Sequence, residues 1–502
     1  EVCTGESGAS CPYTHARTHT HRRAHTHTHT HARTHTAKRP LAWPPAPMDH
    51  TSNASPAMGS ITAASPAPTS TTTEKGAATT ATAAAATGAG GGSGPQWHPA
   101  LVVEAGTHTV RAGFAGQDAP LLTMDACVAR SLARGEVHAV GKATRALSLS
   151  EEHELTWPML RMLEGTDPSQ VEEDVYTIIA YIYQQLDVIP KSTPVVWMEN
   201  TLEGAKQRSA RRQLIAKTLF DRFNCPAIHI CSRAVGALFA AGELTGLVIQ
   251  VGDFLTEIVP VFQGFPIRHA GMEIHKGSKD ISALLQQELT TDSSLSERVR
   301  GLFRYMPLVH HAKENMLYVS PLHPKVDPAH VYFRRGLGEV ETQPLYELPD
   351  GEVIELSQKI RTLPDIFFDP TLADNGGCRV RPADGDLRMP QFPELHRDMG
   401  LHEAVQLCVD MLDQDTQPLI LHTVVLSGGG SLIPGMAQRL ENELNEKLHH
   451  ISGDIEVLAP PDRQLSAWIG GSIVGTLPTF RKLLVTQKEF QENADVVNVR
   501  PL

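Results

Sequence analysis

The amino-acid sequence predicts an α/β fold for the part of the chain that starts at Trp97. Two stretches share one order of features: an apolar strand, a glycine turn with a polar or acidic residue, and a return strand. They lie about 145 residues apart, and segments with helical periodicity separate them. A repeated strand–turn–strand unit joined by helices predicts a duplicated α/β domain in which both turns face one cleft.

The first 96 residues do not have the composition of a folded domain. Thr14 to Thr36 is close to a Thr-His repeat, and Thr51 to Gly94 consists mostly of Ala, Thr, Ser, Pro and Gly. We expect residues 1–96 to be disordered, because they hold too little apolar surface to offset the entropy lost on ordering. The histidines could bind zinc or nickel. We favour a translated simple repeat upstream of the native start, at Met48 or Met58, so that residues 1–47 would not be native.

Charge is distributed unevenly along the chain. The first 96 residues have a net charge of +3, whereas the rest carry 37 basic and 52 acidic side chains, a net charge of −15. An acidic body argues against sequence-specific nucleic-acid binding, because the phosphate backbone binds basic surfaces.

No apolar run approaches the ~20 residues of a membrane span. The seven scattered cysteines form no CxxC pair, which is typical of reduced thiols in a cytosolic or nuclear protein.

The first hairpin begins with the apolar run Leu101 to Val103. Glu104 ends this strand, Gly106 and Thr107 form the turn, and the return strand carries Arg111. Backbone N–H groups in such a turn make a concavity that binds anions. Alone the pattern is weak, because short hairpins containing glycine are common.

A second hairpin with the same order of features strengthens the interpretation of the first as an anion-binding turn. The strand from Leu247 to Val251 is followed by Gly252 and Asp253, and Glu257 to Phe262 is the return strand. Two phosphate-type hairpins indicate one nucleotide cleft rather than two unrelated turns.

Helices and a third glycine cluster complete the pattern. Val171 to Leu186 and Gly204 to Phe223 have apolar residues at helical spacing. Gly428 to Gly430 follow an apolar strand and lead through Pro434 into a helix from Met436 to Leu448. Glycines at a helix entrance allow the backbone to approach a ligand closely.

Five segments resemble actin, and they occur in actin's order: Glu104–Pro120, Gly246–Gly264, Tyr346–Gly351, Leu426–Gly435 and Ala459–Ser472. The resemblance covers Leu101 to Leu502 and identifies the chain as a divergent actin-related protein of the actin superfamily. It implies the actin-like ATPase fold, in which two RNase-H-like domains surround a cleft that holds ATP or ADP with Mg²⁺.

The resemblance also implies the domain boundaries. The first actin-like domain would span 97–240, with a small second subdomain at about 126–157. The second domain would span 241–465, with an insertion at about 371–399, and 466–502 would return to the first domain.

The resemblance assigns a nucleotide-binding role, without a direct metal ligand, to Glu104, Gly106, Thr107, Arg111, Gly252, Asp253, Lys313, Glu314, Gly428, Gly429 and Gly430. Lys313 and Glu314 match the family's adenine-side pair, although a surface charge pair on a helix is the alternative. Gln464 replaces a basic residue at the adenine end, which weakens that end of the site.

Three positions depart from actin where the family hydrolyses ATP. Arg233 replaces the glutamine that orients the attacking water, Gln250 replaces a strand-end aspartate near the metal, and Glu257 replaces a histidine. Arginine has only donors, so it cannot hold a water by the same bonds. We therefore predict weak or absent ATPase activity and name no catalytic residue. The alternatives are that Arg233 and Gln250 are neutral changes, or that Glu257 serves as a base.

The regions that build filaments also differ from actin. Cys127 to Leu155 is shorter than in actin, Arg130 to Val137 replaces the long loop that engages the next protomer, and residues 371–399 are inserted. We expect a non-filament scaffold or regulatory subunit of a multiprotein complex, binding ATP or ADP with impaired hydrolysis. The alternative is an ATP-hydrolysing cytoskeletal filament subunit.

The expected partners are protein subunits, among them actin or other actin-related proteins, with no membrane contact. The opening run Thr109 to Gly113 resembles relatives in chromatin remodellers. It favours a nuclear remodelling complex over a dynactin-type complex in the cytoplasm.

Overall fold

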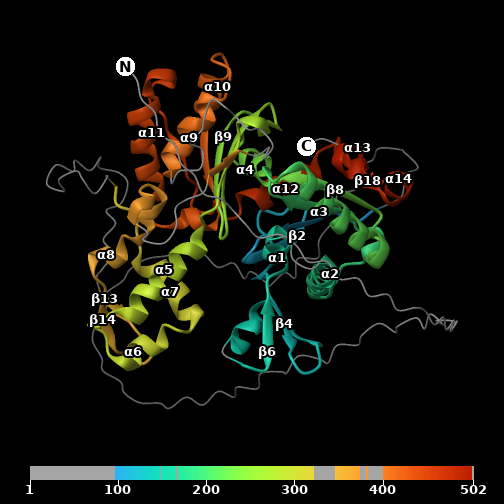
Figure 1. Cartoon of the computed structure of the whole chain (residues 1–502). Coiled ribbons are helices and arrows are strands. Elements are labelled where there is room, and N and C mark those ends of the chain that lie inside the picture. The colour runs from blue at the N-terminus through green and yellow to red at the C-terminus, as the bar shows by residue number, and fades with distance from the viewer. Residues whose placement is uncertain are drawn as a thin grey trace, which may run out of the picture. The chain divides into compact units, whose positions relative to one another are not determined.

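A computed structural model of the chain describes residues 97–148, 150–164, 168–321, 345–372, 380–382 and 399–499 (Figure 1). The predictions for residues 1–96, and those for most of the 371–399 insertion, lie outside the described residues.

The first sheet is built on the strand of the first hairpin. β1 (Leu101–Ala105) pairs antiparallel with β2 (Thr109–Phe114) and parallel with β7 (Val195–Glu199). Over the described residues the strand order is β18–β8–β7–β1–β2–β3, completed by β3 (Leu122–Asp125), β8 (Ala227–Ser232) and β18 (Val485–Thr486). β1 is buried along its whole length, as its apolar sequence predicts for a strand covered on both faces.

The second sheet repeats this arrangement. β9 (Gly246–Val251) pairs antiparallel with β10 (Thr256–Phe262) and parallel with β16 (Val424–Ser427). The remaining strands are β11 (Phe265–Pro266), β12 (Met272–Ile274), β15 (Val380–Pro382) and β17 (Val457–Leu458). In each sheet a three-stranded antiparallel meander continues into two parallel strands, as β3–β2–β1–β7–β8 and β12–β10–β9–β16–β17. The predicted α/β fold with a duplicated unit is confirmed.

Helices cover both sheets. In the first half they are α1 (Pro158–Glu164), α2 (Pro168–Gln185), α3 (Ala205–Lys217) and α4 (Arg233–Ala240). The helix expected from Gly204 to Phe223 is divided, because a π-helical turn over Thr218–Arg222 follows α3 and buries Leu219 and Phe220.

In the second half the helices are α5 (Ser278–Thr291), α6 (Glu297–Leu302), α7 (Met306–Met316), α8 (Gln358–Arg361), α9 (Leu401–Asp410), α10 (Gln417–Leu421) and α11 (Met436–Ser452). α11 is about one turn longer than predicted and ends at Gly453, which has a φ of 76°. The actin-like segment around Tyr346 forms the hairpin of β13 (Leu345–Glu347) and β14 (Val353–Glu355).

A small separate sheet contains β4 (Val128–Ser131), β5 (Val137–Val140) and β6 (His153–Thr156), in the order β5–β4–β6 (Figure 1). A tight turn joins β4 to β5, with hydrogen bonds from Ser131 N to Glu136 O (3.0 Å) and from Gly135 N to Ser131 O (2.7 Å). The connection between β4 and β5 is therefore a compact hairpin.

The C-terminal segment packs on the first sheet through α12 (Ser466–Thr476), α13 (Phe480–Leu483), α14 (Gln487–Glu492) and α15 (Val496–Val499). Trp468 Nε1 donates to Val102 O at 3.2 Å, and Ser472 Oγ donates to Gln117 O at 2.8 Å. α12 also lies against α4 (Figure 1), at a point where a Cβ on Gly470 would lie 2.0 Å from Gly236 O.

Four cysteines fall within the described ranges, and Cys127, Cys225, Cys231 and Cys408 are all buried free thiols. Burial raises the pKa of Cys225 and of Cys231 to about 12, so these thiols are poor nucleophiles. None of the helices in the described part of the chain has the length and apolar character that a membrane crossing requires.

Candidate functional site

One cavity of about 510 Å³ lies between the two hairpin turns. Every residue that the sequence assigns to nucleotide binding lines it: Glu104, Gly106, Thr107, Arg111, Gly252, Asp253, Lys313, Glu314, Gly428, Gly429 and Gly430. The three departures from actin, Arg233, Gln250 and Glu257, line the same cavity, and so does Gln464.

The two hairpin turns have the same geometry. Gly106 N donates to Thr109 O at 2.9 Å, and Gly252 N donates to Leu255 O at 3.0 Å. A Cβ on Gly106 or on Gly252 would lie 2.9 or 2.7 Å from that same carbonyl oxygen. Both glycines are therefore required by a close backbone approach.

The strand register shows that the two hairpins carry different side chains at equivalent positions. Glu104 pairs with Arg111 across the first hairpin, and Gln250 pairs with Glu257 at the equivalent position of the second. Arg111 Nη1 lies 3.3 Å from Glu104 Oε2, so the first hairpin holds an ion pair, while Arg111 Nε is buried without a partner.

Glu257 is only 1% exposed and is held by the loop after β7. Its Oε1 accepts hydrogen bonds from Thr201 N (2.9 Å) and Leu202 N (2.8 Å). Burial raises the pKa of Glu257, while the N–H of Leu202 and the charge of Arg233 oppose the rise. Oε1 of Glu257 therefore holds the backbone of this loop in place.

Arg233 starts α4 and reaches the end of β1. Its Nη2 donates to Ala105 O at 2.5 Å and its Nη1 donates to Asn200 Oδ1 at 2.6 Å. The side chain is deeply buried, and its Nε has no partner. Burial lowers the pKa of Arg233, and Glu104 and Glu257 oppose that shift, so the guanidinium stays charged between the acids of the two hairpins.

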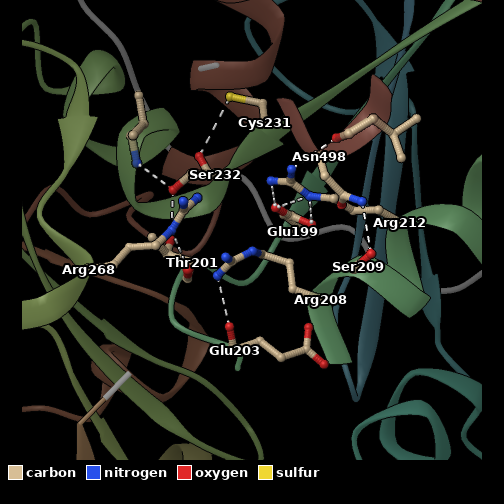
Figure 2. A network of polar contacts seen from close by, with 12 residues as sticks. Glu199, Thr201, Glu203, Arg208, Ser209, Arg212, Cys231, Ser232, Arg268 and Asn498 are labelled. Carbon is tan, nitrogen blue, oxygen red and sulfur yellow. Dashed lines mark hydrogen bonds and ion pairs between the residues drawn. The ribbon is translucent and has the colours of Figure 1, made fainter. Parts of the chain in front are cut away.

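The loop that carries Asn200 is held by a polar network that the sequence motifs do not reveal (Figure 2). Glu199 accepts from Arg212 Nε at 2.9 Å, and Arg212 Nη1 donates to Val497 O at 3.0 Å. The Thr201 and Ser232 hydroxyls lie 2.7 Å apart. The network connects the loop that carries Asn200 to the C-terminal segment. The signal in the sequence was the group of arginines in α3, which follows Glu199 at the end of β7 and Glu203 in the next loop.

The second turn is closed by α5 and α7. Ser278 Oγ donates to Asp253 Oδ1 at 3.1 Å, and Lys313 Nζ lies 3.3 Å from both Ser278 O and Ser278 Oγ. Burial lowers the pKa of Lys313, and Asp253 and then Glu314 oppose the shift. Lys313 therefore faces the cavity rather than forming a surface charge pair.

The third glycine cluster forms the opposite wall. Gly428 has a φ of 90°, and a Cβ there would lie 2.3 Å from Val251 O, whereas a Cβ on Gly429 would meet no atom within 4 Å. Arg463 anchors this loop through Nη2 to Ser431 O (2.7 Å) and Nε to Ser431 Oγ (3.0 Å). Sequence reasoning missed Arg463, because its role depends on a segment 32 residues away.

Two histidines that the sequence interpretation did not include also line the cavity. His108 in the first turn and His310 on α7 contact edge to face, with ring centroids 5.1 Å apart. Burial, together with Lys313 and His108, lowers the pKa of His310 to about 4. His310 is therefore neutral at physiological pH.

The lining fits a nucleotide. The volume of the cavity falls in the range of small-molecule pockets, roughly 300 to 1,000 Å³. Four buried polar atoms of its lining have no protein partner: Arg111 Nε, Arg233 Nε, Gln250 Oε1 and Gln464 Oε1. Buried polar groups are nearly always hydrogen-bonded, so these atoms suit a ligand that carries phosphate and base. Over the described residues, no three His, Cys, Asp or Glu side chains gather as direct ligands of a metal.

Comparison with known proteins agrees with this geometry. A family model described as Actin matches residues 96–501, which include both sheets and the whole cavity lining. An actin-like protein of Neurospora crassa is 30% identical over 417 residues, an alignment that covers 80% of this chain and 97% of that protein.

Proposed function

This chain belongs to the actin family, and we propose that it is an actin-related protein that acts as a non-filament scaffold or regulatory subunit of a multiprotein complex, binding ATP or ADP with impaired hydrolysis. The coarse assignment follows from the family match. The proposal of impaired hydrolysis depends on the cavity, and the proposal of a non-filament role depends on the small sheet of β4, β5 and β6.

The position of Arg233 is the observation that carries the proposal. Hydrolysis of a phosphoanhydride needs a water held in line with the bond, usually by a group that accepts a hydrogen bond. Arg233 supplies donors only, and two of them are bound to Ala105 O and Asn200 Oδ1. The nearby carboxylate of Glu257 has one oxygen occupied by two backbone N–H groups. These contacts support nucleotide binding without efficient turnover.

The hydrolysis test compares the wild type with the double variant Arg233→Gln, Gln250→Asp. A water-positioning group acts mostly on the transition state, so the double variant is expected to raise single-turnover phosphate release when both proteins are saturated with ATP. The matched control is Arg298→Gln, because Arg298 is an exposed arginine outside the cavity. Rapid phosphate release by the wild type would contradict the proposal and favour an active ATPase.

The compact β4–β5 hairpin supports a role outside actin-type filaments. Its turn holds only the short segment between Ser131 and Val137, where the family uses a long loop to contact the next protomer. The alternative of an ATP-hydrolysing filament subunit would need another surface for that contact.

We propose a chromatin-remodelling complex as the assembly and a nuclear location, with a dynactin-type complex in the cytoplasm as the second candidate. The tagged full chain should co-purify with a defined set of protein subunits, actin or other actin-related proteins among them, when its associates are identified by mass spectrometry. Recovery of the chain alone or in long polymers would contradict the scaffold role.

A further inference from the structure

We infer that the cavity takes its nucleotide as the free anion, with the guanidinium groups of Arg233 and Arg111 in place of a divalent cation. The inference rests on the proposed nucleotide binding, since it specifies the form in which this same site accepts its ligand.

Three carboxylates that line the cavity, those of Glu104, Glu257 and Asp253, already have protein partners. Glu104 is paired with Arg111, and Glu257 is held by the backbone of the loop after β7. Asp253 accepts from Ser278 Oγ at 3.1 Å, and Glu314 lies beside Lys313 on α7. Mg²⁺ requires a near-octahedral shell of oxygen ligands and ordered waters, which free carboxylates usually organise. The strand end of the second hairpin offers only the neutral amide of Gln250.

Arg233 and Arg111 are cationic side chains that line the cavity. Arg233 crosses from α4 to the end of β1 and stands between the acids of the two hairpins. Its exposed fraction is 9%, and its Nε is unpartnered in the cavity wall, as is the Nε of Arg111 in the first hairpin. Arginine N–H groups bind phosphate oxygens strongly and keep their charge when buried.

Arg233 is also fixed before any ligand arrives. Its bonds to Ala105 O and Asn200 Oδ1 hold the guanidinium plane, and the network of Figure 2 holds the loop that carries Asn200. A cation that is immobilised in this way can neutralise phosphate charge without recruiting a metal, because its orientation costs no further entropy on binding.

The experiment measures binding of ADP and of ATP to the full chain, purified free of nucleotide, by titration calorimetry and thermal shift. Each nucleotide is titrated once in EDTA and once in excess Mg²⁺. Dissociation constants within about threefold of each other, with matching thermal shifts, are the expected result. Binding in Mg²⁺ but more than about tenfold weaker in EDTA would overturn this inference and leave the proposed nucleotide binding intact.

Absence of binding in both conditions would overturn the inference together with nucleotide binding, and would indicate that Arg233 only joins α4 to the end of β1 and to the loop after β7. The variant Gln250→Asp adds one carboxylate at nearly constant size, so it should weaken binding in EDTA by about tenfold and make Mg²⁺ restore it. Arg233→Met should weaken binding in both conditions. The melting temperature without ligand shows whether each variant is folded, and Gln250→Asp remains informative if Arg233→Met is not. Arg298→Gln should bind as the wild type does.

Discussion

Gly429 differs from its neighbours in the glycine cluster. Gly428 is required by its φ of 90° and by Val251 O, but Gly429 faces open space in the cavity. A methyl group at Gly429 therefore meets the ligand and not the protein. We predict that Gly429→Ala leaves the melting temperature without ligand nearly unchanged and weakens nucleotide binding by about tenfold.

Calorimetric titration with ADP and a thermal melt would check this prediction, and Gly428→Ala is the contrast. That change should cost roughly 1–3 kcal/mol of stability, because it places a side chain at positive φ against the backbone of β9. Equal affinity of Gly429→Ala and wild type would show that no ligand approaches this wall.

Glu203 makes the stability of the protein depend on pH, and a single substitution can isolate its contribution. It is buried beside Arg211, and burial raises its pKa to about 7 while Arg211 opposes the rise. Because the folded-state pKa exceeds the unfolded value, stability from protonated Glu203 is present below about pH 4.5 and is lost as pH rises toward 7. The variant Glu203→Gln lacks this loss.

We predict that the unfolding free energy of Glu203→Gln, relative to the wild type, increases between pH 5 and 7.5 by roughly 2–3 kcal/mol. Urea unfolding at both pH values measures it, and the other titrating groups cancel in the difference. The exposed control Glu152→Gln should show a flat difference. A flat difference for Glu203→Gln would mean that Arg211 keeps Glu203 ionised.

At the scale of elements, the contact of α4 with α12 connects a helix that lines the cavity to a helix that packs on the first sheet. α4 begins with Arg233, and α12 carries Trp468, which bonds to β1. A Cβ on Gly470 would lie 2.0 Å from Gly236 O, which is backbone and cannot move aside alone. We predict that Gly470→Ala destabilises the protein by about 3 kcal/mol or more, because overpacking forces the helices apart.

Chemical denaturation of the variant measures this cost. Gly301→Ala is the matched control, since Gly301 is also helical, on α6, but has open space around it and should be neutral or gain up to about 1 kcal/mol. Similar stabilities for both variants would show that α4 and α12 do not meet as closely in solution.

At the scale of the whole molecule, we predict that the purified full chain does not form long filaments under salt and Mg-ATP conditions that polymerise actin. The reason is the compact β4–β5 hairpin and the insertion at residues 371–399, most of which lies outside the described residues. High-speed sedimentation over a range of protein concentrations measures it, with actin as the positive control. A sharp critical concentration for the pure chain would refute the prediction.

The sequence by itself determined the duplicated hairpins and part of the cavity lining. Each hairpin depends on local features, namely an apolar strand, a glycine that permits a close backbone approach and a return strand. Local features are encoded within a few residues, so Gly106, Gly252 and Gly428 could be placed before the fold was known. The helix boundaries were less certain, as the π-helical turn after α3 illustrates, because packing of Leu219 and Phe220 overrides the periodic pattern.

Only the tertiary structure decided what the departures from actin do. Arg233 binds a carbonyl 128 residues away, and Glu257 accepts from backbone 56 residues away, so neither partner can be read from neighbouring sequence. The same holds for Arg463 on Ser431 and for His108 against His310. A charged side chain buried in a fold takes the partners that the chain topology brings to it, because an unpaired buried charge is costly. Residue types could therefore be assigned to the cavity from sequence, but the partners of its charged side chains became clear only from the three-dimensional arrangement.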